Sequence, residues 1–313
     1  ALIVCHVWGN PADMDPIMEL CRPRGIAVIE DCSHAHGATH KGKKVGSVGD
    51  IGCFSCQGGK LVAAGEGGVL TTDNQELYER AILMGRAEKR AEIREDSWSK
   101  QFAFTGVGYK FRPHPLGIAI AREQLRHLDE MNDIRDRNGA ALDNGLADVA
   151  DVVPQTVLPD CRRVYAYHYM RYDPDQLGGV SIETFLKALA AEGVRTGRIG
   201  YGRLHGQPLF TEGFPYGTER TALTVLEQKP PEMANGPLPT TEHLREYTFS
   251  AAPRLEMECR ELINQYLEAY HKVASAADEL LAYEKEHGEK EPKAQVSGLS
   301  VNPVDAPSQG GRG

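Results

Sequence analysis

The sequence has no apolar run long enough to cross a membrane. A spanning helix needs about 18 or more consecutive apolar residues, and polar or charged residues interrupt every apolar stretch of this 313-residue chain before that length. Basic residues are also in deficit, because 35 Lys and Arg oppose 44 Asp and Glu and leave a net charge of −9. That balance argues against nucleic acid as a partner. We therefore expect a protein that binds neither a membrane nor nucleic acid.

Cysteine pairs are missing as well. The chain has seven cysteines, an odd number, and the C-x-x-C of Cys53 and Cys56 has no second pair at zinc spacing. His34, His36 and His40 lack a carboxylate or thiol that would complete a metal site. We expect free thiols, no metal, and a reducing compartment, which predicts a cytoplasmic protein.

The start of the chain lacks a methionine and a signal peptide. Its first residues, A-L-I-V-C-H-V-W, are already typical of a buried strand, so we expect a fragment whose upstream part is absent. Nucleotide-binding motifs are also missing or incomplete. No G-x-G-x-x-G follows the first apolar run, and the G-x-x-x-x-G-K of Gly37 to Lys43 continues with Lys44 where a P-loop needs Ser or Thr. A plain nucleotide-binding domain is therefore disfavoured.

The composition that remains is that of a globular protein. Hydrophobic residues make up 41% and charged residues 25% of a chain long enough for two domains. We predict an α/β fold in which residues 1–140 form part of a large domain with a mainly parallel sheet, ending in a long bridging helix. Residues 141–284 are predicted to form a smaller α+β domain. Residues 285–313 lack the apolar content to pack, which predicts a disordered tail.

Hydrophobic periodicity predicts the individual elements. Strands at residues 2–5 and 26–29 flank a helix at 14–21, which makes a βαβ unit. The following elements are a turn at 40–44, strands at 51–55 and 67–72, a helix capped by Asp73 that ends near Met84, and an exposed loop at 87–106. The later elements are a bridging helix at 115–146, a strand at 164–172, and helices at 182–191 and 258–283. The apolar stripe of the bridging helix is predicted to be Leu116, Ala119, Ile120, Leu125, Leu128, Met131 and Ile134.

A lysine and an aspartate are the strongest candidates for functional residues. Lys60 lies in a turn of small and apolar residues, C-Q-G-G-K-L-V-A-A-G, and a buried lysine is costly unless its amine is used chemically. Asp31 ends the apolar run I-A-V-I-E-D, and ligands of such sheets gather at the carboxyl ends of strands. Pyridoxal phosphate (PLP) chemistry needs both groups. A lysine amine forms a Schiff base with the cofactor aldehyde, and a carboxylate pairs with the protonated pyridine nitrogen.

Five stretches carry a resemblance to a known family. They are H-V-W-G-N-P-A-D-M-D from His6, E-D-C-S-H-A-H-G-A from Glu30, G-S-V-G-D-I-G-C-F-S-C-Q-G-G-K from Gly46, G-E-G-G-V-L-T-T-D from Gly65, and G-Y-K-F-R-P-H-P-L from Gly108. Over roughly residues 1–285 this pattern resembles the DegT/DnrJ/StrS-type sugar aminotransferases, which are PLP enzymes of the aspartate aminotransferase fold. The resemblance implies that residues 1–140 belong to the large PLP-binding domain.

The resemblance also implies roles for the matching residues. Lys60 would hold PLP and later shuttle a proton, and Asp31 would bind the pyridinium nitrogen. His34 would contact the 3′-hydroxyl of the ring, and Ser55 would contact the phosphate.

The resemblance assigns two further positions. Cys32, with Ser33, occupies a small-residue position beneath the ring. Lys110 stands where many members have an asparagine that reaches the phosphate of the partner subunit, and a lysine can also bind phosphate as a point charge.

The activity implied by the resemblance is transamination of a keto sugar or keto-cyclitol in a homodimer, with glutamate or glutamine as the amino donor. Two alternatives stay open. Some relatives are sugar dehydratases that use pyridoxamine phosphate, but they carry His in place of the lysine, and others are thought to be non-catalytic regulators. Substrate contacts are expected from the 87–106 loop, Tyr201 and His205. The family's N-terminal phosphate turn and stacking aromatic have no counterpart here, so we expect this chain alone to bind PLP weakly and to be inactive.

Overall fold

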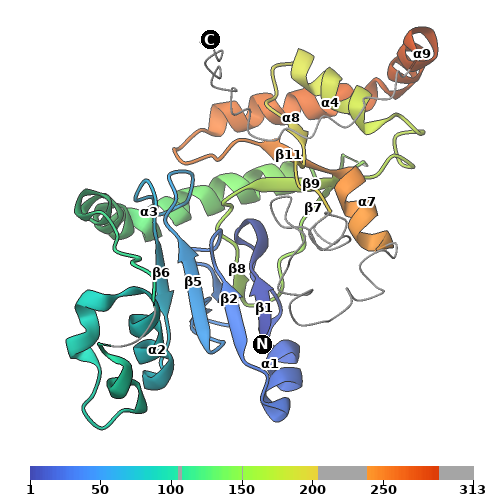
Figure 1. The fold of residues 1–313 in the computed structure, drawn as a ribbon. Helices are drawn as coiled ribbons and strands as arrows, with labels where there is room; N and C mark the ends of the chain where they lie inside the picture. The colour runs from blue at the N-terminus through green and yellow to red at the C-terminus, as the bar shows by residue number, and fades with distance from the viewer. Residues whose placement is uncertain (105–107, 150, 204–237, 289–313) are drawn as a thin grey trace, which may run out of the picture.

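The computed structural model describes residues 1–104, 108–149, 151–203 and 238–288. Figure 1 shows two larger sheets with the long helix α3 running between them. The first sheet has the order β1-β2-β5-β6 and the second the order β10-β11-β9-β7. A third, small sheet has the order β4-β3-β8.

The strands of the described residues are short. The first sheet contains β1 (Leu2–Cys5), β2 (Val28–Asp31), β5 (Ile51–Ser55) and β6 (Gly68–Thr71). The second contains β7 (Val152–Pro154), β9 (His168–Tyr172), β10 (Gly197–Arg198) and β11 (Thr248–Ala252), and the third contains β3 (Thr39–His40), β4 (Lys43–Lys44) and β8 (Cys161–Arg162).

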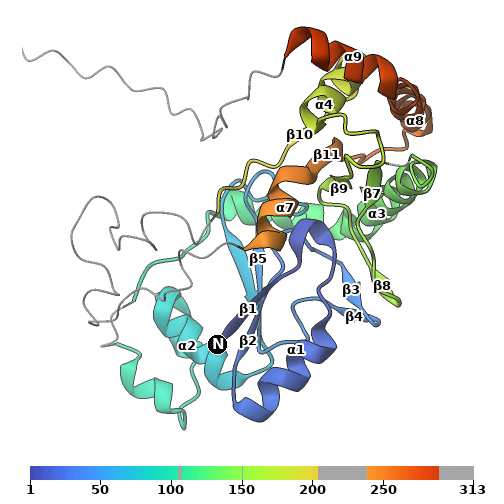
Figure 2. The same ribbon diagram turned by 90° about the vertical axis from the view of Figure 1, so that its right-hand side faces the viewer.

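The helices cover the two larger sheets (Figure 2). The α-helices are α1 (Met14–Cys21), α2 (Gln75–Gly85), α3 (Pro115–Gly145), α4 (Ile182–Ala191), α7 (Pro239–Tyr247), α8 (Arg260–Ser275) and α9 (Ala277–His287). Short 3₁₀ helices are η1 (Val7–Gly9), η2 (Arg22–Arg24), η3 (Ala87–Glu92) and η4 (Trp98–Phe102). No helix in these described stretches is both long and apolar enough to span a bilayer.

The βαβ unit predicted from the sequence is confirmed. β1 and β2 are parallel, with Leu2 opposite Val28 and Cys5 opposite Asp31, and α1 connects them. β2 begins two residues later than predicted because Ile26 still bonds back to the end of α1, its N–H donating to the Cys21 carbonyl at 3.1 Å. Asp31 is therefore the last residue of β2, at the carboxyl end of the strand.

The remaining strands make the first sheet mixed and mostly parallel. β2 and β5 are parallel, whereas β5 and β6 are antiparallel. The predicted turn at 40–44 is a hairpin between β3 and β4, in which Lys41 and Gly42 have φ angles of 48° and 78°. Two successive positive φ angles are typical of the tight type I′ turn that suits a two-residue hairpin.

The second sheet holds the largest hydrophobic core. Its residues pack against α4, α8 and the end of α3, with Phe185, Tyr270, Phe249 and Tyr172 among the fully buried side chains. Phe185 contacts the other three rings at centroid distances of 4.9 to 6.2 Å. This core supports β9 and β11, which face the first sheet across α3 (Figure 1).

Several expectations for individual elements are wrong. Asn74, not Asp73, caps α2, since its side chain accepts hydrogen bonds from the N–H groups of Glu76 and Leu77. The 87–106 segment is not a plain exposed loop, because η3 and η4 lie in it and Ile93 and Ala103 are buried against Ile82 of α2. The prediction missed these two buried apolar residues because most of the residues around them in the sequence are polar.

The final helix and the tail also differ from expectation. The predicted helix at 258–283 is broken at Ala276 into α8 and α9, and α9 continues to His287, into the predicted tail. Residues 289–313 of that tail lie outside the described residues. The division of the chain into domains at residue 140 stays a prediction.

The predicted apolar stripe of α3 is wrong in both halves of the helix. Leu116, Ile120 and Leu125 are 70%, 53% and 59% exposed, and only Leu128 of the stripe is buried. The buried face of the second half is instead polar and consists of Asn132, Arg135, Asn138, Gly139 and Leu142 together with Leu128. These positions recur at helical spacing, so the face is regular although its chemistry is unusual.

Candidate active site

The ends of β1 and β2 lie beside the middle of β5 where Asp31 is placed. Cys5 of β1 and Cys53 of β5 are the direct neighbours of Asp31 in the two parallel pairs. Residues in register on adjacent strands point to the same face of a sheet, so Asp31 stands between two thiols at the carboxyl edge. Burial is the main cause that raises the pKa of Cys5, and the carboxylate of Asp31 raises it further. Both thiols are unpaired.

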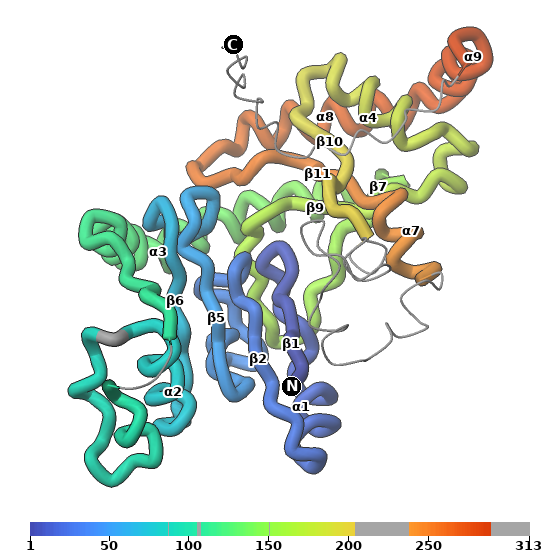
Figure 3. Tube along the Cα trace, in the orientation of Figure 1, coloured from blue at the N-terminus to red at the C-terminus, as the bar shows by residue number. Residues whose placement is uncertain are grey.

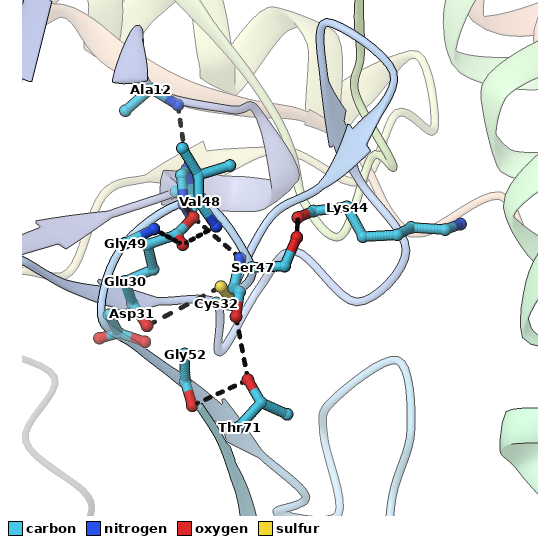
Figure 4. Close-up of polar contacts among 12 residues, drawn as sticks. Ala12, Glu30, Asp31, Cys32, Lys44, Ser47, Val48, Gly49, Gly52 and Thr71 are labelled. Carbon is cyan, nitrogen blue, oxygen red and sulfur yellow. Dashed lines mark hydrogen bonds and ion pairs between the residues drawn. The ribbon is translucent and has the colours of Figure 1, made fainter. Parts of the chain in front are cut away.

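Beneath Asp31, a fully buried carboxylate fixes the strand end. Glu30 is 0% exposed and accepts hydrogen bonds from the N–H groups of Gly46, Val48 and Gly49 at 2.7 to 2.8 Å, and its Oε2 lies 3.0 Å from Nε2 of His6 (Figure 4). Burial by itself raises the pKa of Glu30, but these bonds outweigh it and lower the pKa below its usual range. Glu30 thus ties β2 to the 46–49 turn.

The turn that carries Lys60 is shaped by Gln57. The Gln57 carbonyl accepts from the Lys60 N–H at 2.9 Å, and its side-chain oxygen accepts from the Gly59 N–H at 2.8 Å. From outside the turn, the Arg254 guanidinium donates to the Gly59 carbonyl at 3.1 Å. The Q-G-G before Lys60 therefore shapes the turn, with Gln57 supplying both acceptors.

Lys60 and Asp31 influence the same two neighbouring side chains. Both act electrostatically on Cys5 and on His34, which places the amine and the carboxylate around the same two residues. Lys60 is half-buried rather than buried, so the expected desolvation cost applies only in part. Its amine makes no hydrogen bond or ion pair with any residue that the structure describes.

His34 is oriented as a neutral hydrogen-bond donor. Its Nδ1 accepts from the Trp8 N–H at 3.3 Å, so Nε2 is the nitrogen that carries the proton. Burial, followed by the positive charge of Lys60, lowers the pKa of His34 and keeps the ring neutral near pH 7. The ring packs edge-on against Tyr167 with centroids 4.9 Å apart.

Ser55 lines a cavity of about 710 Å³ together with Ser33, Arg86, Arg112 and His114. The Ser55 oxygen accepts from the Gln57 N–H at 3.3 Å, which leaves its hydroxyl proton to donate. Lys110 is exposed and does not line this cavity, whereas its neighbours Phe111 and Arg112 do.

The side chain of Cys32 lies in the protein interior. Its side chain is 0% exposed and packs in a core cluster with Val45, Leu61 and Val62. Burial, as the largest cause, raises the pKa of its thiol. That Cys32 lies beneath a cofactor ring stays a prediction.

Two groups of possible metal ligands occur among the described residues. His6, Glu30 and Cys32 are buried together, but Glu30 already accepts from four donors. Asp13, Asp15 and His40 form the second group, where Lys41 pairs with Asp15 and His40 lies 3.4 Å from Asp13. Neither group contains the predicted site residues Asp31 and Lys60. The expectation of no metal stays a prediction.

Several participants were missed by sequence reasoning. Glu30 was overlooked because a carboxylate in a strand is usually solvent-facing, although its position one residue before Asp31 was a signal. Arg254 could not be found, because it lies 194 residues beyond Lys60 in the sequence. Of the two expected substrate residues, Tyr201 is 58% exposed, and partial burial, followed by Tyr167 and Cys5, raises its pKa. His205 lies outside the described residues.

The comparisons with known proteins identify the class to which this fold and site belong. Residues 1–245 match the DegT/DnrJ/EryC1/StrS aminotransferase family, and the chain belongs to that family. The aminotransferase from Psychrobacter cryohalolentis superimposes with a TM-score of 0.71 at 23% identity, over 88% of this chain and 69% of that one. DesV from S. venezuelae superimposes with a TM-score of 0.66 at 26% identity, over 87% and 64%.

Two relatives are similar to this chain in amino-acid sequence. The chain is 33% identical over 296 residues to the L-glutamine:2-deoxy-scyllo-inosose aminotransferase of Streptoalloteichus tenebrarius, covering 92% of this chain and 66% of that protein. It is also 33% identical over 196 residues to the L-glutamine:scyllo-inosose aminotransferase of Streptomyces griseus, covering 61% and 46%. The chain thus spans between about half and two thirds of the length of these relatives.

The donor set fits PLP, the cofactor of this family. Lys60 presents a free amine and Asp31 a half-buried carboxylate at the neighbouring strand end. His34 has an N–H and Ser55 a hydroxyl proton that remain available to donate. An aldehyde, a pyridinium nitrogen, a ring hydroxyl and a phosphate would find a partner among these four groups.

Proposed function

We propose that the protein is a PLP-dependent aminotransferase that transfers an amino group from glutamine or glutamate to a keto-cyclitol or keto sugar. The observation that carries the proposal is that Asp31 ends β2 and Lys60 lies in the turn after β5, the parallel neighbour of β2. Relatives named as L-glutamine:inosose aminotransferases support glutamine as donor and a cyclitol ketone as acceptor. Because the chain spans only part of those relatives, the activity is assigned to the full-length protein.

In this proposal each residue has one task. When bound, PLP supplies an aldehyde that takes up the amino group and a protonated ring that withdraws electrons from the donor α-carbon. Lys60 anchors the aldehyde, and its released amine moves a proton away from the donor α-carbon. Asp31 holds the proton on the ring nitrogen. His34 donates its Nε2 hydrogen to the ring oxygen, and Ser55 donates to the phosphate.

Three finer assignments belong to the same proposal. Lys110 contributes to phosphate binding from the partner subunit. The protein is a homodimer, supported by exposed apolar side chains on α3 and the segment before it, including Phe111 and Leu116. It works in the cytoplasm, where its seven unpaired cysteines stay reduced.

The decisive experiment replaces the proposed anchor. In the full-length protein, Lys60→Ala should abolish transamination, reducing kcat by at least about 10³-fold, because both the covalent anchor and the proton carrier are lost. Borohydride treatment of the PLP-loaded protein should add the cofactor mass to the peptide containing Lys60. Lys43→Ala, which removes an exposed lysine of β4, should change neither result.

Three other outcomes would contradict the proposal, and each would favour a different conclusion. Normal turnover by Lys60→Ala would remove the aminotransferase assignment for this site. PLP binding without an adduct at Lys60 would favour the dehydratase alternative, and no cofactor binding at all would favour a regulatory role.

A further inference from the structure

A continuous chain of polar contacts joins the Lys60 turn to the loop that follows Asp31. It starts at the Gly59 carbonyl, which accepts from Arg254 at 3.1 Å. The Arg254 Nε lies 3.6 Å from the Glu256 carboxylate, whose same oxygen accepts from Arg135 at 3.3 Å. Figure 3 shows the segment after β11 running beside the connection between β5 and β6, which brings these groups together.

The series of polar contacts continues through α3 to the loop that follows Asp31. Arg135 is 2% exposed and donates to the side-chain oxygen of Asn132 at 2.6 Å. The Asn132 amide donates to the His36 carbonyl at 2.9 Å. Gly37 has a φ of +85°, and a Cβ there would lie 2.5 Å from the Asn132 amide nitrogen. The loop therefore needs glycine at 37 for Asn132 to reach the carbonyl.

The first contact of this chain acts on a single peptide unit. The carbonyl of Gly59 and the N–H of Lys60 belong to one planar group. Arg254 holds the carbonyl, and the Gln57 carbonyl holds the N–H at 2.9 Å. With both ends of the plane fixed, the position of the Lys60 Cα and the direction of its N–Cα bond are also fixed, which limits where the side chain can start.

The segment that carries Arg254 and Glu256 is itself clamped. The Asn138 amide donates to the carbonyls of Leu255 and Met257 at 2.9 and 2.8 Å, on either side of Glu256. α3 thus carries two anchors, Asn132 for the Asp31 loop and Asn138 for the segment that reaches Lys60. The separation between the two loops is set by one rigid helix.

We propose that Arg254 is a positioning residue that, through Glu256, Arg135 and Asn132, keeps Lys60 at a fixed distance and angle from the Asp31–His36 loop. The inference rests on the proposed function of Lys60 and Asp31 in binding PLP. Arg254 touches the backbone next to Lys60 and not the reacting atoms. Its guanidinium bridges a carbonyl and a carboxylate together, which the single ammonium of a lysine does less well.

The test compares Arg254→Gln, Arg254→Lys and Arg137→Gln in the full-length protein. Arg137 is the matched control, because it also joins α3 to the segment after β11, through an exposed pair with Glu258, but contacts neither loop. Hydrogen exchange of the cofactor-free protein is measured at the 57–64 turn. Arg254→Gln should speed exchange of the Lys60 amide about tenfold, Arg254→Lys less, and Arg137→Gln less than twofold.

A second readout uses the PLP-loaded protein. Arg254→Gln should shift the pH midpoint of the absorbance band of the lysine-bound cofactor and lower kcat about tenfold, with partial rescue by Arg254→Lys. Equal exchange in Arg254→Gln and Arg137→Gln would overturn the inference. Faster exchange in Arg254→Gln together with no PLP binding by the unmodified protein would uphold the anchor and overturn the proposed function instead.

Discussion

Glu30 and Asp151 are two carboxylates without solvent access, and they differ in what surrounds them. Glu30 accepts from three backbone amides and contacts His6, so its charge is compensated. Both oxygens of Asp151, which is 0% exposed, lack a hydrogen-bond partner among the described residues. Burial, as the largest cause, raises the pKa of Asp151 to about 6, while its own backbone N–H lowers the pKa and Asp173 raises it by a smaller amount. The first carboxylate stabilises the fold when ionised, and the second destabilises it.

The pH dependence of the Asp151 contribution follows from the sign of this shift. Because the pKa of Asp151 is higher in the folded protein than in the unfolded chain, the contribution of Asp151 to stability is most favourable below pH 4. This contribution is lost as the pH rises through about 6. Asp151→Asn should therefore raise the free energy of unfolding at pH 8 by up to about 3 kcal/mol, with little difference near pH 4. Urea unfolding of both proteins at the two pH values checks this.

The control for Asp151 is an exposed aspartate of the same region. Asp175→Asn should change the free energy of unfolding by less than about 0.5 kcal/mol at either pH. A destabilised Asp151→Asn variant at pH 8 would mean that the ionised carboxylate has an unseen favourable partner.

At the scale of elements, α3 organises the site although it supplies no catalytic group. Its buried face is polar because it meets backbone carbonyls of two segments rather than apolar side chains. Gly139 on the same face lies against Tyr165, where a Cβ would come within 2.4 Å of the ring. The close packing of Gly139 against Tyr165 and the hydrogen bonds from the asparagine amides to backbone carbonyls replace the usual apolar stripe.

The anchoring by Asn138 can be measured directly. Asn138→Ala leaves the carbonyls of Leu255 and Met257 without their donor and should lower the free energy of unfolding by about 2 kcal/mol. Asn144→Ala, at an exposed position of the same helix, should change it by less than about 0.5 kcal/mol. Equal effects of the two substitutions, measured by chemical unfolding, would show that the Asn138 bonds add nothing beyond helix propensity.

At the scale of the whole molecule, the first half of α3 and the segment before it expose apolar side chains. Tyr109, Phe111, Leu116 and Ile120 are 67%, 63%, 70% and 53% exposed. Contiguous exposed apolar groups of this kind mark contact surfaces in soluble proteins. A second copy of the chain is the partner that we propose for this surface.

The proposed homodimer predicts a change in mass. Leu116→Glu combined with Ile120→Glu should halve the mass of the full-length protein in light scattering, because two desolvated carboxylates would face the partner. Leu20→Glu, at an exposed leucine of α1, should leave the mass unchanged. A dimer that survives the double substitution would place the interface elsewhere.

The amino-acid sequence by itself determined the βαβ unit, the position of Asp31 at the end of β2, and Lys60 in a glycine-rich turn. These features are local: a strand of four residues, a helix with apolar spacing and a turn of small residues each follow from neighbouring residues. The family could be predicted for the same reason, since its motifs are short contiguous stretches. The family match over residues 1–245 agrees with that prediction.

Only the tertiary structure decided which face of α3 is buried, where Cys32 points and how the Lys60 turn is held. Asn132, Asn138 and Arg254 resemble ordinary surface residues in the sequence, because the carbonyls that they bind lie 96 to 195 positions away. Periodicity predicts that a face is buried against apolar groups, and it fails where the buried partners are backbone carbonyls. Such long-range hydrogen bonds exist only after the two sheets have folded around α3, so no local pattern encodes them.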